Sequence, residues 1–259
     1  MKIYMLCDME GVSGIRRMTQ VQADSPDYAE GRQLMMADIN AAVDGAFLGG
    51  ATEVVVCDTH ASGGQVRVGE MDERAEYEIP GAGRMMPALD ESFAGVVLLG
   101  HHARAGTLNG FLDHTMSSKQ WFEYRINDQV VGEIGIEAAW AGHYDVPVLL
   151  VSGDAATAAE AQALLGNVTC VVVKWGIGRN LARCLSLPKA HAILRDGVAD
   201  AVRRAGERKP FKPALPATLQ LTLYRSDMAE PYARRAGVER VDARTVRKEI
   251  ASLLDVKRW

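Results

Sequence analysis

Short apolar runs alternate with helical patterns along most of the chain, and no other feature restricts the possible folds as strongly. The runs are rich in aliphatic and β-branched side chains and lie at residues 2–7, 52–58, 94–100, 146–154 and 168–175. Such runs are typical of strands buried on both faces of a parallel sheet. Between them, segments such as 27–50 and 156–166 place apolar side chains at helical spacing. We therefore predict an α/β fold, with a mostly parallel sheet flanked by helices.

The pattern changes near residue 185. A helix beginning at residue 186 is followed by a polar link with prolines, an alternating strand at 217–225 and a basic tail that we expect to be helical. We predict two parts, an α/β domain over residues 1–184 and a smaller α+β lobe over residues 185–259. Within the first part, a hairpin should turn at Asn127-Asp128.

Composition excludes several classes of protein. The chain has 259 residues, 48% of them hydrophobic and 24% charged, with a net charge of -4 and no long basic run. These values indicate a soluble globular protein and no nucleic-acid footprint. No apolar stretch is long enough for a bilayer, and the N-terminus lacks the features of a signal peptide. The four cysteines are scattered, as is typical of reduced thiols, so we expect a cytoplasmic protein.

Two carboxylates follow the first strand in the stretch CDMEGVSG. Side chains at i and i+2 of a strand share a face, so Asp8 and Glu10 should lie side by side. Like charges this close repel unless a cation or a shared proton holds them. An aspartate can bridge two ions through its two oxygens, which would explain two acids at one strand end.

Imidazole and carboxylate side chains follow other strands at the corresponding place. Asp58 and His60 come after the second run, His101 and His102 after the third, and Glu133 opens a predicted helix. Ligands of α/β proteins bind beyond the carboxyl ends of the strands. Imidazole with carboxylate suits zinc or a similar divalent ion, and two such ions can activate a water for hydrolysis. We therefore predict a metal-dependent hydrolase, with its catalytic site in residues 1–184.

Each of these features has a structural explanation when taken alone. An acid before a glycine turn can cap the turn, one histidine of a pair can pack in the core, and Glu133 can favour a helix N-terminus. Their joint appearance at the same ends of successive strands favours a metal site. His143 and His191 lack this context, and we expect them to be structural.

Five motifs together resemble those of the zinc-dependent D-aminopeptidases of the dipeptide-operon type. They are DMEGVSG at 8–14, DTH at 58–60, GHHARAG at 100–106, DHTM at 113–116 and GEIGIEA at 132–138. The resemblance extends over about residues 1–190. It implies a binuclear zinc aminopeptidase that removes N-terminal D-amino acids from short peptides and assembles as a ring-shaped homo-oligomer, such as a decamer.

The resemblance also assigns roles by position. It implies that Asp8 bridges two zinc ions, with Glu10 on one ion and His60, His102 and Glu133 on the other. It singles out His114 as a catalytic residue that does not bind metal. A positioned histidine can pass a proton to the leaving amine or donate to the developing oxyanion.

Two other functions stay open from the residues alone. Another metal-dependent amidohydrolase or a phosphoesterase could use the same scaffold, and Arg104 is the one evident cation within the motifs for a phosphoester. A non-catalytic protein that binds a metal or a small molecule would hold its ion fully ligated, and His114 would then be dispensable.

Overall fold

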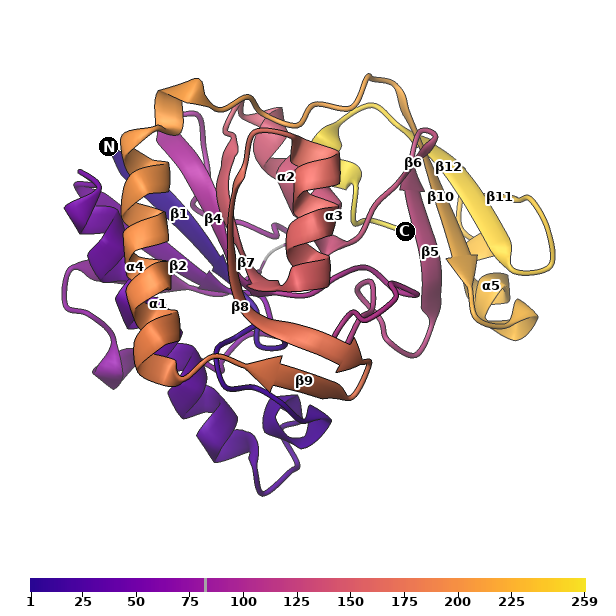
Figure 1. Cartoon of the computed structure of the whole chain (residues 1–259). Coiled ribbons are helices and arrows are strands. Elements are labelled where there is room, and N and C mark those ends of the chain that lie inside the picture. The colour runs from indigo at the N-terminus through magenta and orange to yellow at the C-terminus, as the bar shows by residue number, and fades with distance from the viewer. Residues whose placement is uncertain (82) are drawn as a thin grey trace.

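The computed structural model describes residues 1–81 and 83–259, and a seven-stranded sheet forms its centre (Figure 1). The strand order is β3-β2-β1-β4-β7-β8-β9. Neighbouring strands pair in parallel, except that β9 is antiparallel to β8. The strands are β1 (Lys2–Cys7), β2 (Glu53–Asp58), β3 (Ala75–Glu78), β4 (Phe93–His101), β7 (Val148–Asp154), β8 (Thr169–Gly178) and β9 (Leu181–Cys184). The predicted α/β fold with a mostly parallel sheet is confirmed.

Helices cover both faces of this sheet (Figure 1). The helices α1 (Tyr28–Leu48) and α4 (Leu187–Arg203) pack on one face, while α2 (Glu133–His143) and α3 (Ala155–Leu165) pack on the other. In β1, Ile3 and Met5 belong to the hydrophobic core under α1 and α4, and Tyr4 and Leu6 belong to the core on the face of α2 and α3. Burial on both faces explains why the strand is continuously apolar.

A second, antiparallel sheet lies beyond α2 and α3, at the right of Figure 1. Its order is β11-β12-β10-β5-β6, and α5 (Ser226–Ala233) packs against it. Its strands are β5 (Trp121–Ile126), β6 (Gln129–Val130), β10 (Ala217–Leu223), β11 (Glu239–Arg240) and β12 (Thr245–Ile250). The hairpin predicted at Asn127-Asp128 is present, and Asn127 has a φ of 53°, a value suited to a tight turn.

The basic tail begins with the helix α5, as predicted, but the strands β11 and β12 follow it where we also expected helix. Residues 245–250 form β12, which pairs with β10. Within β12, Val246 and Ile250 are buried while Arg247 and Glu249 are exposed, so the segment has the alternation of a half-buried strand. The basic side chains belong to its solvent-facing side, and they concealed this pattern in the sequence.

The boundary predicted between residues 184 and 185 stays a prediction. Two elements pack with the part of the chain that lies on the other side of it. The helix α4 follows the boundary but packs with α1 on the large sheet. The hairpin β5–β6 precedes the boundary but belongs to the small sheet. Short 3₁₀ turns complete the structure at η1 (Met18–Val21), η2 (Val68–Glu70), η3 (Ala205–Glu207) and η4 (Leu253–Asp255).

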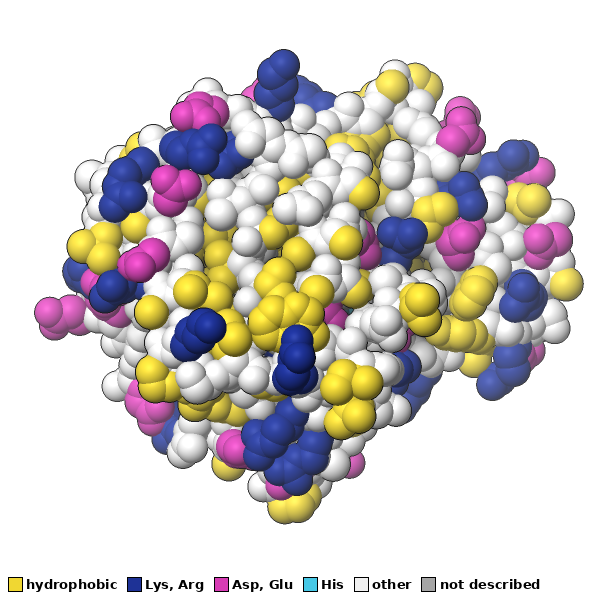
Figure 2. Space-filling view, in the orientation of Figure 1, with side chains coloured by type: hydrophobic (Ala, Val, Ile, Leu, Met, Phe, Trp, Pro, Cys, Tyr) yellow, Lys and Arg dark blue, Asp and Glu magenta, His cyan; other side chains and the backbone are white. Residues whose placement is uncertain are grey.

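Surface and thiol properties follow the composition. All four cysteines are free, and Cys7 and Cys57 are buried on opposite faces of the large sheet. Figure 2 shows charges of both signs spread over one face of the molecule, with hydrophobic side chains gathered near β8 and β9. Among the described residues, no helix has both the length and the apolar character needed to cross a bilayer.

Candidate metal centre

The register of three adjacent strands brings the predicted site residues to one edge of the large sheet. Cys7, the last residue of β1, lies opposite Asp58 on β2 and Leu99 on β4. The chain therefore leaves all three strands at nearly the same level. Asp8, His60 and His102 follow these strand ends within three residues, at the edge where α/β proteins bind ligands.

A turn, and not strand alternation, brings Asp8 and Glu10 together. The strand β1 ends at Cys7, so the i and i+2 geometry that we predicted does not apply beyond it. The turn packs closely on the end of β4, where the Gly11 amide donates to the Gly100 carbonyl at 2.7 Å. A Cβ at Gly11 would lie 2.0 Å from a backbone oxygen of β4, so only glycine fits there.

The first cluster consists of Asp8, Glu10 and His60. The Nδ1 of His60 lies 3.0 Å from Asp8 Oδ1 and 3.2 Å from Glu10 Oε2. The other ring nitrogen, Nε2, is 2.9 Å from the Val21 carbonyl, to which it can donate. This contact leaves a lone pair on Nδ1, directed at the two carboxylates.

The second cluster consists of His102, His114 and Glu133. The two imidazole rings stack with their centroids 3.9 Å apart, and their Nε2 atoms lie 3.2 and 3.6 Å from Glu133 Oε1. Each Nδ1 faces a backbone carbonyl, at 3.0 Å from Ala103 for His102 and at 2.9 Å from Leu112 for His114. Both Nε2 atoms therefore keep a lone pair on the side of the acid.

Asp8 connects the two clusters. Its Oδ1 faces His60 Nδ1, and its Oδ2 lies 3.3 Å from His102 Nε2. The two oxygens of one carboxylate thus point to imidazoles that come from different strands. The resemblance places His60 with His102 and Glu133 on one ion, whereas the His60 ring here lies against Asp8 and Glu10. That division of the ligands stays a prediction.

Attraction between the imidazoles and the carboxylates shifts the pKa values of side chains in both clusters. Burial lowers the pKa of His60, but the nearby Glu10 and Asp8 carboxylates outweigh burial and raise it to about 12. Burial raises the pKa of Glu133, but the charge of His102, whose Nε2 lies 3.2 Å from Oε1, lowers that pKa to about 2. The nearby imidazoles of His102 and His60 likewise outweigh burial at Asp8 and hold its pKa well below the usual value. A cation bound here would take the place of the imidazole protons.

The donor set fits a divalent metal ion. In each cluster, one atom from each of the three side chains lies within 4.8 Å of the other two. His102 Nε2 is buried and makes no hydrogen bond to any described residue, although carboxylate oxygens lie on two sides of it. An orphaned imidazole nitrogen among carboxylates, with its other nitrogen tied to the backbone, is what a zinc ligand requires.

His101 lies apart from both clusters. Its Nε2 is 2.5 Å from Glu137 Oε2 on α2, and both side chains are buried. The pair anchors the end of β4 to the helix that begins with Glu133. The structure thus brings His102, and not His101, to the acids.

The remaining predicted residues have structural contacts. Asp58 accepts hydrogen bonds from the Gln65 and Val66 amides and stands outside both clusters. His143 is exposed at the C-terminal end of α2. His191, which we expected to be structural, is partly buried, with its Nε2 3.3 Å from an oxygen of Asp38.

Sequence reasoning missed Lys174, which is fully buried within β8. Its ammonium donates to the Glu10 carbonyl at 2.7 Å and to the Ile15 carbonyl at 2.8 Å. It also lies 4.9 Å from the centre of the Phe111 ring. Burial lowers the pKa of Lys174 to about 8, so at neutral pH the side chain is still mainly protonated. The one sequence feature that could have indicated this residue is a lone lysine at the end of an otherwise apolar run.

The fold and the donor set of the site fit the class of metal-dependent hydrolases. The chain belongs to the D-aminopeptidase family, because the model of that family (Peptidase_M55) matches residues 1–259. A D-aminopeptidase of Bacillus subtilis (strain 168) is 40% identical over 216 residues, which cover 82% of this chain and 78% of that protein.

The likeness extends to three dimensions. The chain is similar to the solved structure of a Zn-dependent D-aminopeptidase, DppA from Bacillus subtilis, described as a self-compartmentalizing protease. The TM-score is 0.95 at 35% identity, and the match covers 99% of this chain and 94% of the other. The family predicted from the five motifs is thereby confirmed.

Proposed function

We propose that this protein is a D-aminopeptidase that binds two zinc ions and releases the N-terminal D-amino acid of short peptides. The observation that carries the proposal is the position of Asp8, whose two carboxylate oxygens face His60 and His102 in different clusters. A carboxylate so placed suits two ions at a short separation. Family membership and the Zn-dependent relative support the same conclusion.

The proposed ligands are Asp8, Glu10, His60, His102 and Glu133. When bound, zinc supplies a Lewis acid for the peptide carbonyl and lowers the pKa of water toward about 7. The carboxylates contributed by the chain balance the charge of the ions. The backbone contacts of His60 and His102 fix which ring nitrogen remains free for a ligand bond.

The proposed proton carrier is His114. The Leu112 carbonyl holds its Nδ1, so that Nε2 is the nitrogen able to exchange a proton at the site. His114 is more exposed than its stacking partner, with 16% of the side chain accessible against 1% for His102. Hydrolysis breaks the peptide C–N bond, the oxygen of water ends on the released D-amino acid, and His114 delivers a proton to the leaving amine.

We further propose a closed homo-oligomer in the cytoplasm. The sequence resemblance suggested a ring such as a decamer, and the structural relative is described as self-compartmentalizing. Light scattering at micromolar concentration tests the assembly. A single species several times the chain mass of 28.1 kDa supports it, and a monomer contradicts it.

The experiment that tests the function is a substrate panel run with metal analysis. Purified protein is assayed on D- and L-alaninamide, N-acetyl-D-alaninamide and a phosphomonoester, before and after chelation and zinc return. Hydrolysis of D-alaninamide alone, lost on chelation and restored by zinc, supports the proposal. Equal turnover of the L-amide or the acetylated amide contradicts D-aminopeptidase activity, and phosphoester turnover points to the alternative hydrolase.

A further inference from the structure

A pocket of about 240 Å³ is lined by residues that lie close in sequence to all three members of the second cluster. Three of its lining residues belong to the chain segments that carry the cluster. Arg104 comes two residues after His102, Thr115 directly follows His114, and Val131 comes two residues before Glu133. Hydrogen bonds tie two of these segments together, since Ala105 N donates to Thr115 Oγ1 at 3.2 Å. The pocket is therefore built on the same three chain segments as the groups that would act on a peptide bond.

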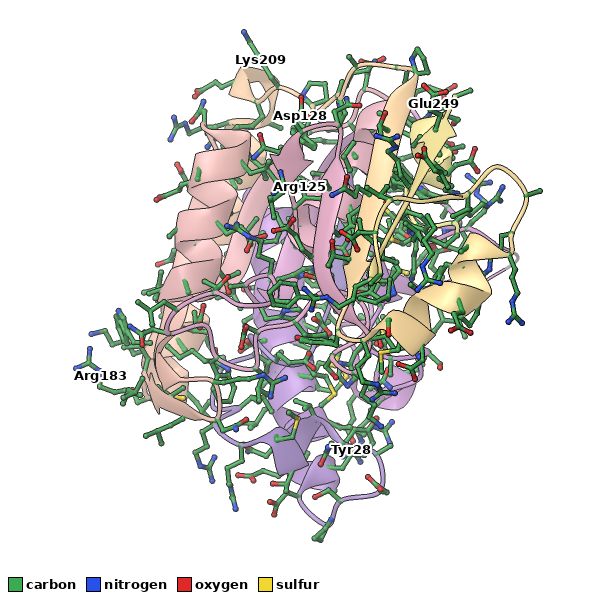
Figure 3. The ribbon with its side chains drawn as sticks, turned by 90° about the vertical axis from the view of Figure 1, so that its right-hand side faces the viewer. Tyr28, Arg125, Asp128, Arg183, Lys209 and Glu249 are labelled. Atoms are coloured by element: carbon green, nitrogen blue, oxygen red, sulfur yellow. The ribbon has the colours of Figure 1, made fainter. Side chains whose placement is uncertain are left out.

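The opposite wall comes from the small antiparallel sheet. Phe122, Tyr124 and Val130 of the β5–β6 hairpin line it. In Figure 3, the labelled Arg125 and Asp128 mark this hairpin. The pocket therefore joins a catalytic edge to an apolar wall, as specificity pockets commonly do.

The charge available in the pocket is positive. Arg104 makes no side-chain hydrogen bond to any described residue, and its nearest carboxylate oxygen, on Glu160, is 3.9 Å away. Glu160 is instead held by the Arg104 backbone amide at 2.7 Å. The acid that lines the pocket, Glu123, is paired with Arg125 at 2.8 Å. A guanidinium with one long ion pair and no side-chain hydrogen bond to a described residue, beside a neutralised acid, suits an anionic group of the ligand.

We propose that this pocket binds the leaving residue of a dipeptide and that Arg104 pairs with its free carboxylate. The inference rests on the proposed function and deepens it. His114 delivers its proton to the leaving amine, so the leaving residue lies beside His114 and within reach of the pocket wall at Thr115. A volume below the roughly 300–1,000 Å³ of drug-sized sites suits one amino acid. The planar guanidinium can hold a carboxylate by two parallel hydrogen bonds.

The test compares three substrates that differ only beyond the D-alanyl group. They are D-alanyl-D-alanine, the same dipeptide with an amidated carboxyl end, and D-alaninamide, which has no leaving residue. Wild-type protein should prefer the free dipeptide over its amide by about 10–100-fold in kcat/KM, the usual worth of a charge-assisted pair. Arg104→Met should remove this preference, chiefly through KM, and leave turnover of D-alaninamide within about twofold.

Two further variants sharpen the result. Arg104→Lys keeps the charge but not the planar group that donates two parallel hydrogen bonds, and it should restore part of the preference. Arg195→Met removes an arginine of similar exposure on α4, with 46% of the side chain accessible against 41% for Arg104, and should change nothing.

Three outcomes would overturn the proposal. Wild-type protein that hydrolyses the free and amidated dipeptides equally well assigns no role to the carboxylate. Arg104→Met that slows all three substrates alike shows a general effect on the site. Both results leave the proposed aminopeptidase function intact. The third outcome is zinc-loaded protein that hydrolyses none of the three substrates, which contradicts that function and the role of the pocket together.

Discussion

The two clusters of the candidate metal centre are held in place by different means. The turn that carries Asp8 and Glu10 is braced by side chains distant in the sequence. Lys174 donates to two carbonyls of this segment, and Asp38 accepts a hydrogen bond from the Ser13 amide at 2.8 Å. The first cluster therefore depends on correct packing of β8 and α1 against the turn.

The two histidines of the second cluster are held by their own neighbours in the chain. His102 contacts the carbonyl of the next residue, and His114 contacts that of Leu112, two residues earlier. The Met116 amide donates to Glu133 Oε1 at 2.7 Å. Substitutions distant in sequence should therefore disturb the first cluster and spare the second. Only Asp8 belongs to both environments.

The largest effect is expected for Asp8→Ala, which removes the group that the clusters share. Metal content should fall at both positions, and turnover of D-alaninamide should fall by about 10³-fold or more. Metal analysis of the purified variant measures the first effect and a steady-state assay the second. Glu10→Ala is the matched comparison, because it should empty one position only. Retention of both ions in Asp8→Ala would show that Asp8 is not the bridge.

The next largest effect is expected for His114→Ala. Turnover should fall by about 10²–10⁴-fold, the usual worth of a positioned acid–base group, while the melting temperature stays close to that of wild-type protein. His143→Ala, in an exposed histidine at the end of α2, is the control and should keep full activity. Unchanged turnover in His114→Ala with zinc bound would remove its catalytic role.

Lys174→Met tests the remote bracing of the first cluster. The substitution leaves the buried Glu10 carbonyl without a donor and the Ile15 carbonyl with only the Cys184 thiol, so we expect a loss of about 2–4 kcal/mol in the free energy of unfolding. Titration with Co²⁺ should show weaker binding of one ion and unchanged binding of the other. Lys209→Met, at an exposed lysine, serves as control. Equal weakening of both ions would mean that the clusters are not held independently.

The smallest effect is expected at His191, which contacts Asp38 from α4. The Asp38 carboxylate, 3.3 Å from Nε2, outweighs partial burial and raises the pKa of His191 in the folded protein. Its contribution is therefore fully present below the unfolded value of about 6.5 and is lost as pH rises through the folded pKa. We expect His191→Gln to cost about 0.5 kcal/mol at pH 5.5 and less at pH 9. Urea unfolding at both pH values measures this, and a cost that grows with pH contradicts it.

Much of the site could be predicted because strand ends obey a general rule. Apolar runs locate the strands, parallel pairing aligns their carboxyl ends, and so Asp8, His60 and His102 were expected at one edge. The rule gives no geometry beyond the last strand residue, and for this reason the turn that joins Asp8 to Glu10 was misjudged. His114 lies in a loop and could be found only through the family resemblance.

Other features depend on contacts that no local pattern contains. Lys174 lies more than 150 positions from the carbonyls that it holds, and a single lysine in a strand gives no sign of its partners. The strand β12 was taken for helix because its charged residues concealed two buried aliphatic positions. That Arg104 has only one long ion pair, at 3.9 Å to Glu160, can be learned only from the structure.

Zinc content of His114→Ala tests the central claim most directly, because His114 stands within 3.6 Å of a proposed ligand and stacks on another. Wild-type protein, His114→Ala and His102→Ala are purified together, loaded with zinc and measured by elemental analysis beside turnover. We predict two ions per chain in wild-type protein and in His114→Ala, fewer in His102→Ala, and strongly reduced turnover in both variants. Loss of an ion from His114→Ala would make this histidine a ligand and contradict its assignment as the proton carrier.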